Sequence, residues 1–568
     1  MAAFRDILYD EARHLDILYI QNHMAAMHLR LSLPPRSDTP DTAVEIRPAE
    51  AERWLKGLPL LNVAESTQML NSQLIGLNRM ALDDKTRLRL LESMRSPIQH
   101  VSQALQKTYI GLPLPLTDKA LQTIVWVRQL HTEMAFGYKL IAFDSTAIPK
   151  LDHAQLSMVG LAIHRAIRYL TELLFRSFEL YGPPPAGAWY EIHQLYRYAE
   201  LLGITDTPLE DKLNNALPQV SINHAYKQAL LLDFSDPYHL PTFLLAKIYR
   251  YLDRWAGIAQ LSPGVAALKS HCQFLINLDQ DRAGAVNTET AAITTEVRYR
   301  LLNTTELARV VHQQLMVLQA GQQPDPEGLE KDFFANLGHD MLLRLISAWG
   351  VNPKRVFTRS LRTNRRSQIA VGIDAINFHI NGERFTPSTS EVGPQPRRTA
   401  LGPGSGTPNR VTQPEAFPPT TLWELTDESA GGYALAKSGN HAETVRVGDL
   451  LASRPDSGDG GWEIGIVRWV RTSGADNIEM GVQRVSPGAA AVAVLPLEDT
   501  QERYFLALAL PEVHAMKQPA TLLTPRGIFK SGRIMSLDNS YRTRQIKAVK
   551  LVELSGSFER FQYEMIEG

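Results

Sequence analysis

The apolar residues of this 568-residue chain change their spacing partway along the sequence. Up to about residue 345 they recur in steps of three and four, which is the period of a helix with one buried face. Beyond residue 420 they fall in short runs separated by turn residues, as is typical of half-buried strands. The sequence therefore predicts a multidomain α + β protein with a large all-α N-terminal region and a β-rich C-terminal region. The clearest helical stripe runs through Leu156, Val159, Ile163, Ile167, Leu170, Leu174 and Phe178.

Proline and glycine mark the predicted boundaries. Gly182 and the three prolines after it end a helix, because proline lacks an N–H and clashes with the preceding turn. The helical domain, residues 1–345, could divide into two subdomains near 182–188. Within residues 387–419, 19 of the 33 residues are Pro, Gly, Ser or Thr, so this segment cannot bury enough apolar surface to offset its ordering entropy. We expect a flexible loop over residues 386–420.

Three further segments flank this loop. Residues 350–385 form a basic connector and a first β-strand, which we expect over Gln368–Ile380. Residues 421–490 contain several short strand candidates. Residues 491–568 add more, including Thr521–Ser536, which is long enough for a hairpin. The sequence leaves open whether 491–568 belongs to the same β domain as 421–490.

The bulk composition excludes several classes of protein. Hydrophobic content of 44% and charged content of 21% fit a folded, soluble chain. With 59 basic and 60 acidic residues the net charge is −1, so only a local patch could attract nucleic acid or an anionic membrane. Cys272 is the only cysteine, which excludes an intramolecular disulfide and a cysteine-based zinc cluster. We find no secretory signal and no apolar run near the ~18 residues of a membrane span, and expect a cytoplasmic protein without membrane insertion.

The sequence supports no catalytic or metal site. Sixteen histidines are spread without the spacing of metal ligands, and neither a nucleophile elbow nor a Walker loop is present. We therefore predict that the protein is not an enzyme, and that it has no catalytic residues, no metal and no cofactor.

A strongly basic segment precedes the first expected strand. From Lys354 to Arg366 there are six basic residues and no acidic one. A guanidinium group binds phosphate or a guanine edge with two hydrogen bonds, and its flat face stacks on a base. Arg362, Arg365 and Arg366 are therefore candidate ligands for a nucleotide. The alternative for this basic run is a solvated face or an interdomain contact.

A second cluster, Asp427-Glu-Ser429-Ala-Gly431-Gly432, follows the loop. The Asp427 carboxylate can accept hydrogen bonds from guanine N1–H and N2–H₂, and the Ser429 hydroxyl can donate or accept. Gly431 and Gly432 allow positive φ angles and close approach of a ligand to the backbone. The alternative is an ordinary turn, in which Asp and Ser hydrogen-bond their own backbone.

In this order, R-x-x-x-R followed by D-x-S-x-x-G resembles the signature of PilZ domains, which bind the bacterial dinucleotide cyclic di-GMP. The resemblance covers about residues 355–490. It implies an antiparallel PilZ-like β-barrel, as an atypical PilZ module fused C-terminal to a helical domain. It also implies that Arg362 and Arg366 hold phosphates and stack on guanine. Asp427, Ser429 and Gly432 would then form the turn that reads the base.

One departure concerns the spacing of the two motifs. Arg366 and Asp427 are 61 positions apart, which exceeds the few tens of residues typical of PilZ domains. The excess lies in the 386–420 loop. Because of it, Arg365, Arg359 or the pair Arg397–Arg398 could serve in place of the motif arginines.

We therefore expect a bacterial cyclic di-GMP receptor. Its helical domain would engage an unidentified protein partner, and neither DNA nor RNA would be bound. One alternative is a nucleotide-independent scaffold or chaperone-like adaptor with a degenerate PilZ-like barrel. Another is RNA binding by the basic segment with Trp423, Trp462 and Trp469, against which the near-neutral net charge counts.

Overall fold

The computed structural model describes residues 29–37, 44–264, 272–286, 298–325, 328–330, 332–335, 337–350, 359–362, 365–386, 388, 418–439, 444–458, 460–473, 477–498, 504–512 and 519–566. Its contacts divide the chain into two compact units, which we call the helical unit and the β unit. The helical unit comprises most of residues 1–354, and the β unit comprises residues 355–568 with two short segments from earlier in the chain.

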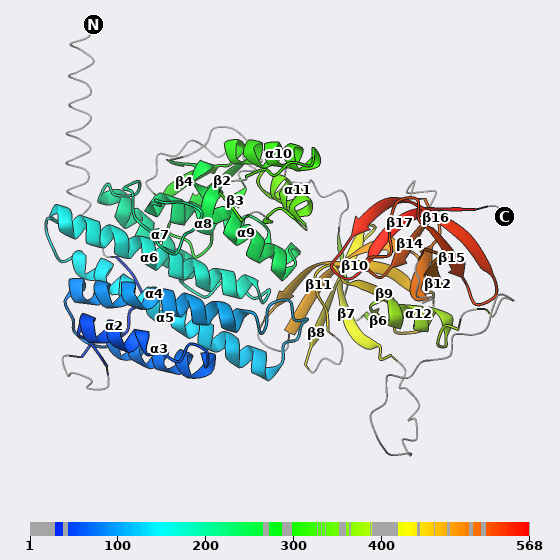
Figure 1. Ribbon diagram of the computed structural model, residues 1–568, viewed down its shortest axis with the longest axis horizontal. Coiled ribbons are helices and arrows are strands. Elements are labelled where there is room, and N and C mark those ends of the chain that lie inside the picture. Colours follow the sequence, from blue (N-terminus) through cyan, green and yellow to red (C-terminus); the bar gives the residue numbers. More distant parts are fainter. Residues whose placement is uncertain are drawn as a thin grey trace, which may run out of the picture. The chain divides into compact units, whose positions relative to one another are not determined.

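The helical unit is built from long helices that run alongside one another (Figure 1). Several begin where the sequence supplies an N-cap: Asp83, Thr117 and Asp152 each accept a hydrogen bond from the backbone N–H three residues further on. The helices are α2 (Pro48–Lys56), α3 (Val63–Asn78), α4 (Asp84–Gln106), α5 (Asp118–Ser145), α6 (His153–Phe178), α7 (Ala188–Leu201), α8 (Ile222–Asp233), α9 (Thr242–Trp255), α10 (Thr305–Gln319) and α11 (Gly338–Trp349). Two short 3₁₀ helices, Pro237–His239 and Ala256–Ile258, flank α9.

The multidomain α + β arrangement is confirmed, and so is the apolar stripe on α6. From Val159 to Phe178 each residue of the stripe is buried. The described residues on both sides of 182–188 belong to the same compact unit, so the structure makes no division there.

The expectation of helix throughout residues 1–345 is wrong over 260–303. Here four short strands form an antiparallel sheet in the order β1-β4-β2-β3. In β2, Phe274 and Ile276 are buried at alternate positions. A run of five residues is too short for a period of two to be told from a period of 3.6 in the sequence. The strands are β1 (Gln260–Pro263), β2 (Gln273–Asn277), β3 (Ala285–Val286) and β4 (Tyr299–Asn303).

The β unit contains two barrels. In the middle barrel, strands are ordered β5-β7-β6-β9-β10-β11-β8, and a further pairing of β7 with β8 closes the ring. Each pairing is antiparallel. The strands are β5 (Ser360–Leu361), β6 (Arg366–Val371), β7 (Thr421–Ser429), β8 (Gly432–Ser438), β9 (Leu450–Pro455), β10 (Glu463–Thr472) and β11 (Asn477–Ser486).

The expected first strand, Gln368–Ile380, is correct only over its first four residues, Gln368 to Val371. Strand β6 ends at Val371, and helix α12 (Ile373–Asn381) follows. Gly372 lies between them with φ +86° and ψ 155°, a backbone conformation that only glycine adopts without strain. The 386–420 loop lies almost entirely outside the described residues.

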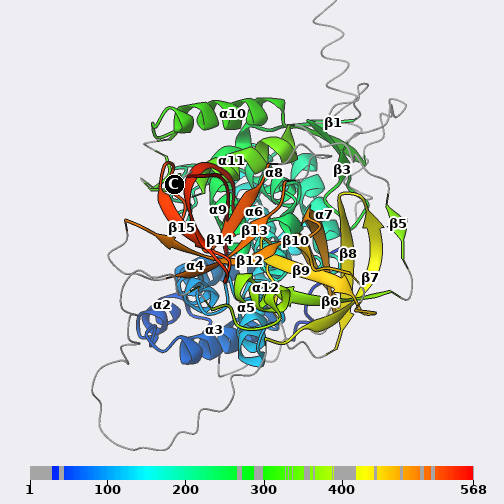
Figure 2. The same cartoon turned by 90° about the vertical axis from the view of Figure 1, so that its right-hand side faces the viewer.

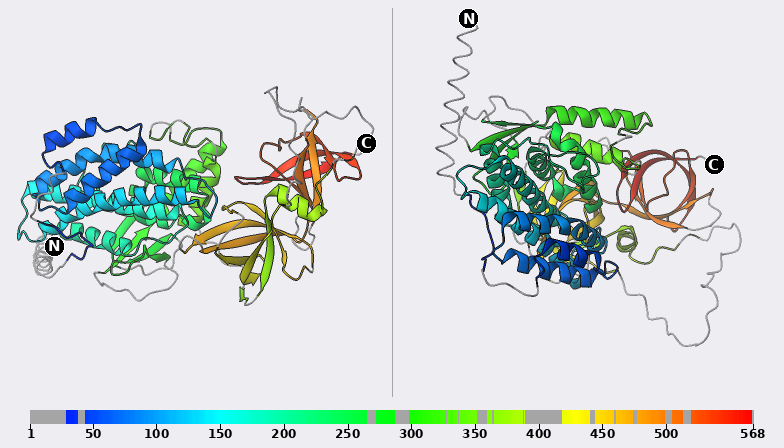
Figure 3. Two further views of the ribbon diagram at one scale, coloured as in Figure 1. Left: turned by 90° about the horizontal axis from the view of Figure 1, so that it is seen from below. Right: turned by 60° about the vertical axis from the view of Figure 1, so that its left-hand side comes forward.

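Residues 490–566 form a second, separate closed barrel, so the question that the sequence left open is answered. Its order is β12-β13-β14-β17-β16-β15, and the right-hand view of Figure 3 shows the ring end-on. Thr521–Ser536 is not a hairpin, because β14 pairs with β13 and β17 whereas β15 pairs with β12 and β16. The strands are β12 (Ala490–Pro496), β13 (Phe505–Leu510), β14 (Thr521–Thr524), β15 (Ile534–Asp538), β16 (Thr543–Leu554) and β17 (Glu559–Met565).

The two barrels share a hydrophobic core. Helix α12 contacts β6 and β9 of the middle barrel and β12 and β13 of the second (Figure 2). Buried Ile376 of this helix belongs to one cluster with Trp462 and Ile464 from one barrel and Leu508 and Phe558 from the other. None of the helices in the described part of the chain combines the length and apolarity that a membrane crossing requires.

Candidate functional site

The two sequence motifs lie on the same strand pair of the middle barrel. Strand β5, just before Arg362, pairs with the end of β7. Strand β6 begins at Arg366, which lies opposite Glu424 of β7. The R-x-x-x-R segment therefore passes along β7, because the strands before and after it both pair with that strand.

The D-x-S-x-x-G motif forms the end of β7 and a tight hairpin into β8. Ser429 and Gly432 are opposite each other in the β7–β8 pairing, which leaves two residues for the turn. The Ser429 hydroxyl donates to the Gly432 carbonyl oxygen at 3.1 Å, as the ordinary turn interpretation predicts. A Cβ on Gly432 would lie 2.3 Å from the Val482 carbonyl oxygen, so glycine is required by the close approach of β11.

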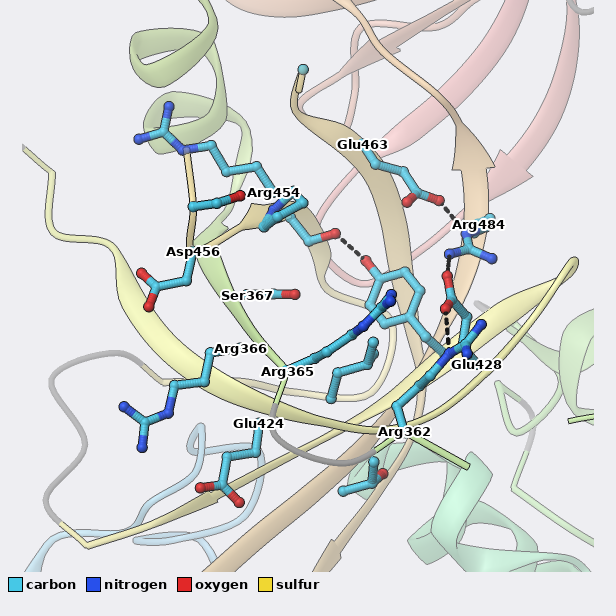
Figure 4. Close-up of a pocket in the computed structure, with 17 residues that line it drawn as sticks. Arg362, Arg365, Arg366, Ser367, Glu424, Glu428, Arg454, Asp456, Glu463 and Arg484 are labelled. Carbon is cyan, nitrogen blue, oxygen red and sulfur yellow. Dashed lines mark hydrogen bonds and ion pairs between the residues drawn. The ribbon is translucent and has the colours of Figure 1, made fainter. Parts of the chain in front are cut away.

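A cavity of about 970 Å³ lies beside these motifs. This volume lies at the upper end of the range for small-molecule sites in proteins. The lining is rich in arginine and carboxylate side chains (Figure 4). The lining residues are Arg362, Arg365, Arg366, Ser367, Glu424, Leu425, Thr426, Glu428, Tyr433, Ser453, Arg454, Pro455, Asp456, Ser457, Gly461, Glu463 and Arg484.

Arg484 holds one wall of the cavity together. Its Nε donates to Glu463 Oε1 at 2.5 Å and its Nη2 donates to Glu428 Oε1 at 2.5 Å, while Nη1 donates to the Ser429 carbonyl oxygen. The guanidinium carbon also lies 5.3 Å from the centre of the Tyr433 ring. The Tyr433 hydroxyl is 2.7 Å from the Ser453 hydroxyl. This wall is therefore fixed by charged hydrogen bonds.

The two carboxylates on this wall differ electrostatically. The hydrogen bond from Arg484 lowers the pKa of Glu428, burial opposes this, and a weaker effect of the hydrogen bond from Arg362 lowers the pKa further. Burial raises the pKa of Glu463, and Arg484 only partly offsets that effect. Burial likewise raises the pKa of the Tyr433 hydroxyl.

Two arginines in the cavity have no partner among the described residues. Arg365 and Arg366 are exposed, and no acidic or polar group in that part of the chain pairs with either side chain. Arg362, by contrast, donates from Nε to Glu428 Oε2 at 3.1 Å. Figure 4 shows Arg365 and Arg366 extending in different directions from the start of β6. The cavity thus offers two unpaired cationic groups to an anion.

The structure brings together part of the predicted site. Arg362, Arg365 and Arg366 line the cavity, whereas the predicted residues of the second motif do not. Asp427 instead accepts a hydrogen bond from Arg359 at 2.9 Å. A bulge between Leu425 and Asp427 shifts the alternation of β7, and Glu428, one residue beyond Asp427, lines the cavity. Of the alternative arginines, Arg359 therefore pairs with the second motif, and Arg397–Arg398 lie outside the described residues. The residues of the second motif outside the lining are Asp427, Ser429, Gly431 and Gly432.

Sequence reasoning missed the residues that come from the other strands. Arg454 lies one residue before the end of β9, with Nε donating to Gln368 Oε1 at 2.9 Å and its guanidinium carbon 4.5 Å from the centre of the Trp462 ring. Glu463 begins β10, and Arg484 lies near the end of β11. Arg454 is the single charged residue of β9, whereas β10 and β11 contain other charged residues as well, and no spacing in the sequence relates the three. Within the described residues, no group of His, Cys, Asp and Glu is arranged to hold a metal ion.

Comparison with known proteins identifies three consecutive segments. The model described as "Cyclic-di-GMP receptor FimW, N-terminal domain" matches residues 49–266. The model "Cyclic-di-GMP receptor FimW, middle PilZ domain" matches residues 273–399 and 390–491. The model "FimW C-terminal beta-barrel domain" matches residues 490–566.

One curated relative spans nearly the whole chain. It is "Cyclic-di-GMP receptor FimW" of Pseudomonas aeruginosa, 25% identical over 585 residues that cover 95% of this chain and 94% of that protein. No solved structure matches. The matched middle segment contains both motifs and the arginine-lined cavity, between a helical domain and a second barrel. The chain therefore belongs to the PilZ-domain family, as an atypical PilZ module fused C-terminal to a helical domain.

Proposed function

We propose that this chain is a bacterial cyclic di-GMP receptor that binds the dinucleotide in the arginine-lined cavity of its middle barrel. The observation that carries the proposal is the pair of exposed, unpartnered arginines, Arg365 and Arg366, inside a cavity of about 970 Å³. The name of the relative that covers 95% of the chain supports the same ligand. The protein acts by binding, and no cofactor is needed.

The residue chemistry fits this ligand. Cyclic di-GMP has two phosphates and two guanine bases, and arginine can bind the phosphates bidentately or stack on a base. Arg365 and Arg366 are available without breaking an existing ion pair. Arg362 becomes available when its hydrogen bond to Glu428 opens, and Glu428 then keeps its bond to Arg484.

The second motif is proposed to shape the rim of the site. Ser429, Gly431 and Gly432 set the β7–β8 turn, and the Ser429 carbonyl oxygen is one of the groups that anchor Arg484. Asp427 does not line the cavity, so it reaches a bound base only if the end of β7 rearranges. We therefore assign direct ligand contact to the three arginines. The residues of the second motif form the turn beside them.

The proposed output is a shift in the relative arrangement of the two units, which a protein partner of the helical unit senses in the cytoplasm. Arg359 to Arg366 lie at the start of the β unit, so a ligand held by this segment would restrict the connection to the helical unit. No DNA, RNA or membrane insertion is part of this function.

Calorimetric titration of the full-length protein with cyclic di-GMP tests the proposal. We expect binding, and a loss of about tenfold or more in affinity in Arg366→Ala, because a hydrogen bond to a charged group contributes about 1.5–3 kcal/mol. Arg526→Ala removes an exposed arginine from the second barrel and should bind as the wild type does.

Two results would contradict the proposal. One is the absence of heat at micromolar protein and ligand, and the other is an equal loss of affinity in Arg366→Ala and Arg526→Ala. Recovery of the same partner from lysate with and without the nucleotide would instead support a scaffold function.

A further inference from the structure

A receptor that distinguishes guanine from adenine needs a group that reads the base. Guanine presents the neighbouring donors N1–H and N2–H₂, whereas adenine presents an acceptor at N1. A carboxylate accepts both guanine donors and repels the adenine N1 lone pair. Arginine alone cannot make this distinction, because the phosphates that it binds are the same in both dinucleotides.

Four carboxylates line the cavity, and three of them are poorly suited to this task. Both oxygens of Glu428 are already occupied, Oε1 by Arg484 and Oε2 by Arg362. Glu424 and Asp456 are exposed, so water competes for their hydrogen bonds. Asp427, which the sequence favoured, does not line the cavity and is paired with Arg359.

The fourth carboxylate, Glu463, has the required properties. Its side chain is 27% exposed, and Arg484 fixes one oxygen through a 2.5 Å hydrogen bond. The other oxygen, Oε2, has no hydrogen-bond partner among the described residues. Figure 4 shows Glu463 on the same wall as Glu428 and Arg484.

Arg484 makes a carboxylate acceptable at this position. A carboxylate facing a ligand with two negative charges would normally weaken binding by repulsion. Arg484 bridges Glu463 and Glu428, so the wall carries less negative charge than two free carboxylates, and the orientation of Glu463 is fixed before the ligand arrives.

Resting on the proposed function, we infer that Glu463 is the residue that selects guanine, and that Arg484 is the residue that positions it. The inference concerns the same cavity but a different strand, β10, from the two motifs. It assigns base selection to a residue outside both of them.

The test measures the affinity of full-length variants for cyclic di-GMP and for cyclic di-AMP by calorimetry. In Glu463→Gln, we expect cyclic di-GMP to bind about tenfold or more weakly, because a hydrogen bond from a guanine N–H to the free carboxylate oxygen contributes about 1.5–3 kcal/mol. Cyclic di-AMP should bind no more weakly than to the wild type. The discrimination between the two dinucleotides then falls by the same factor.

Glu424→Gln is the matched control. It removes the same charge from the same cavity at an exposed position. Because losing a negative charge favours an anionic ligand, its affinity for cyclic di-GMP should rise. If the affinity for cyclic di-GMP falls in Glu463→Gln and rises in Glu424→Gln, base recognition by Glu463 is supported. A general effect of charge would change both affinities in the same direction.

Other outcomes would overturn the inference. It fails if Glu463→Gln binds cyclic di-GMP as tightly as the wild type, or if it loses affinity equally for both dinucleotides. Glu463→Asp, which retains the charge but withdraws the carboxylate, should also lose affinity for cyclic di-GMP. If the wild type binds neither dinucleotide, the proposed function fails together with this inference, whereas unchanged binding in Glu463→Gln overturns only the inference.

Discussion

At the scale of single residues, the close approach of the β11 backbone constrains the β7–β8 hairpin. Gly432 belongs to the sequence motif, yet its side of the hairpin faces β11 rather than the cavity. A Cβ there would meet the Val482 carbonyl oxygen at 2.3 Å. The glycine is therefore needed for the packing of β8 on β11, and through it for the position of the Ser429 carbonyl that anchors Arg484.

This packing predicts the effect of Gly432→Ala. The added methyl group must push β11 or β8 away, and we expect a loss of about 1–3 kcal/mol in the free energy of unfolding. Urea unfolding followed by tryptophan fluorescence measures it. Gly488→Ala is the control, because a Cβ at Gly488 meets nothing within 4 Å, and should change stability by about 0.5 kcal/mol or less. Equal stability of the two variants would contradict the steric argument.

In the helical unit, the constraint at the scale of single residues comes from buried ion pairs. Asp211 accepts a 2.7 Å hydrogen bond from Arg95 and lies 3.1 Å from Arg165, and the Asp211 side chain is only 4% exposed. Burial alone would raise the pKa of Asp211, but the charges of Arg165 and Arg95 outweigh burial and lower it to about 2. Both guanidinium groups also pair with Glu92, but that carboxylate is 29% exposed, so removing the Asp211 charge takes away their buried anion.

Asp211→Asn should therefore cost about 3–5 kcal/mol at neutral pH. Because the folded pKa of Asp211 lies below its ordinary value, its contribution is complete above about pH 4 and is lost as the pH falls through about 2. The difference from the wild type should shrink over that range, as measured by urea unfolding and circular dichroism at 222 nm. Exposed Asp118→Asn should change stability by about 1 kcal/mol or less. A difference that stays constant down to pH 2 would contradict the assignment.

At the scale of elements, α12 connects the two barrels. Asn377 of this helix donates to the carbonyl oxygens of Val492 and Ala507, at 3.0 and 2.9 Å. These two residues are partners across the β12–β13 pairing. The helix thus satisfies backbone groups of the second barrel while its apolar side chains complete the shared core.

Ile376→Ala tests this connection. Ile376 is fully buried, and its truncation should cost about 2–5 kcal/mol through lost burial and the cavity left behind. We expect both barrels to lose stability together, as seen by hydrogen exchange in β9 and β13. Asp374→Ala alters an exposed residue of the same helix and serves as the control. Destabilisation confined to one barrel would argue against a common core.

At the scale of the whole molecule, ligand binding and signal output are separate questions. A ligand that binds only the folded β unit stabilises it by about 2.7 kcal/mol at a concentration of 100 times Kd. The amides of the helical unit are protected from hydrogen exchange by the ligand only if the stability of that unit is coupled to that of the β unit.

Hydrogen exchange of the full chain with and without cyclic di-GMP measures that coupling. We expect slower exchange in β6, β7, β10 and β11, which line the cavity, and a change in the helical unit as well. At a ligand concentration near the wild-type Kd, Arg366→Ala should show both effects strongly reduced, because its affinity is about tenfold lower. Protection restricted to the β unit would exclude transmission through the chain while leaving ligand binding intact.

The sequence by itself determined the class of each half and the location of the arginines. The 3.6-residue period of α6 extends over six turns, so one buried face was unambiguous, and Arg362, Arg365 and Arg366 indeed line one cavity. The sequence did not determine the short elements. The sheet within 260–303 depends on packing, and the change from β6 to α12 depends on the backbone angle at Gly372.

Only the tertiary structure decided which carboxylates line the cavity. A bulge in β7 turns Asp427 from the cavity and leaves Glu428 in it, and barrel closure brings Glu463 and Arg484 from later strands to the same wall. The reason is that local spacing fixes the period of a strand, whereas bulges and pairing between distant strands fix where each side chain lies.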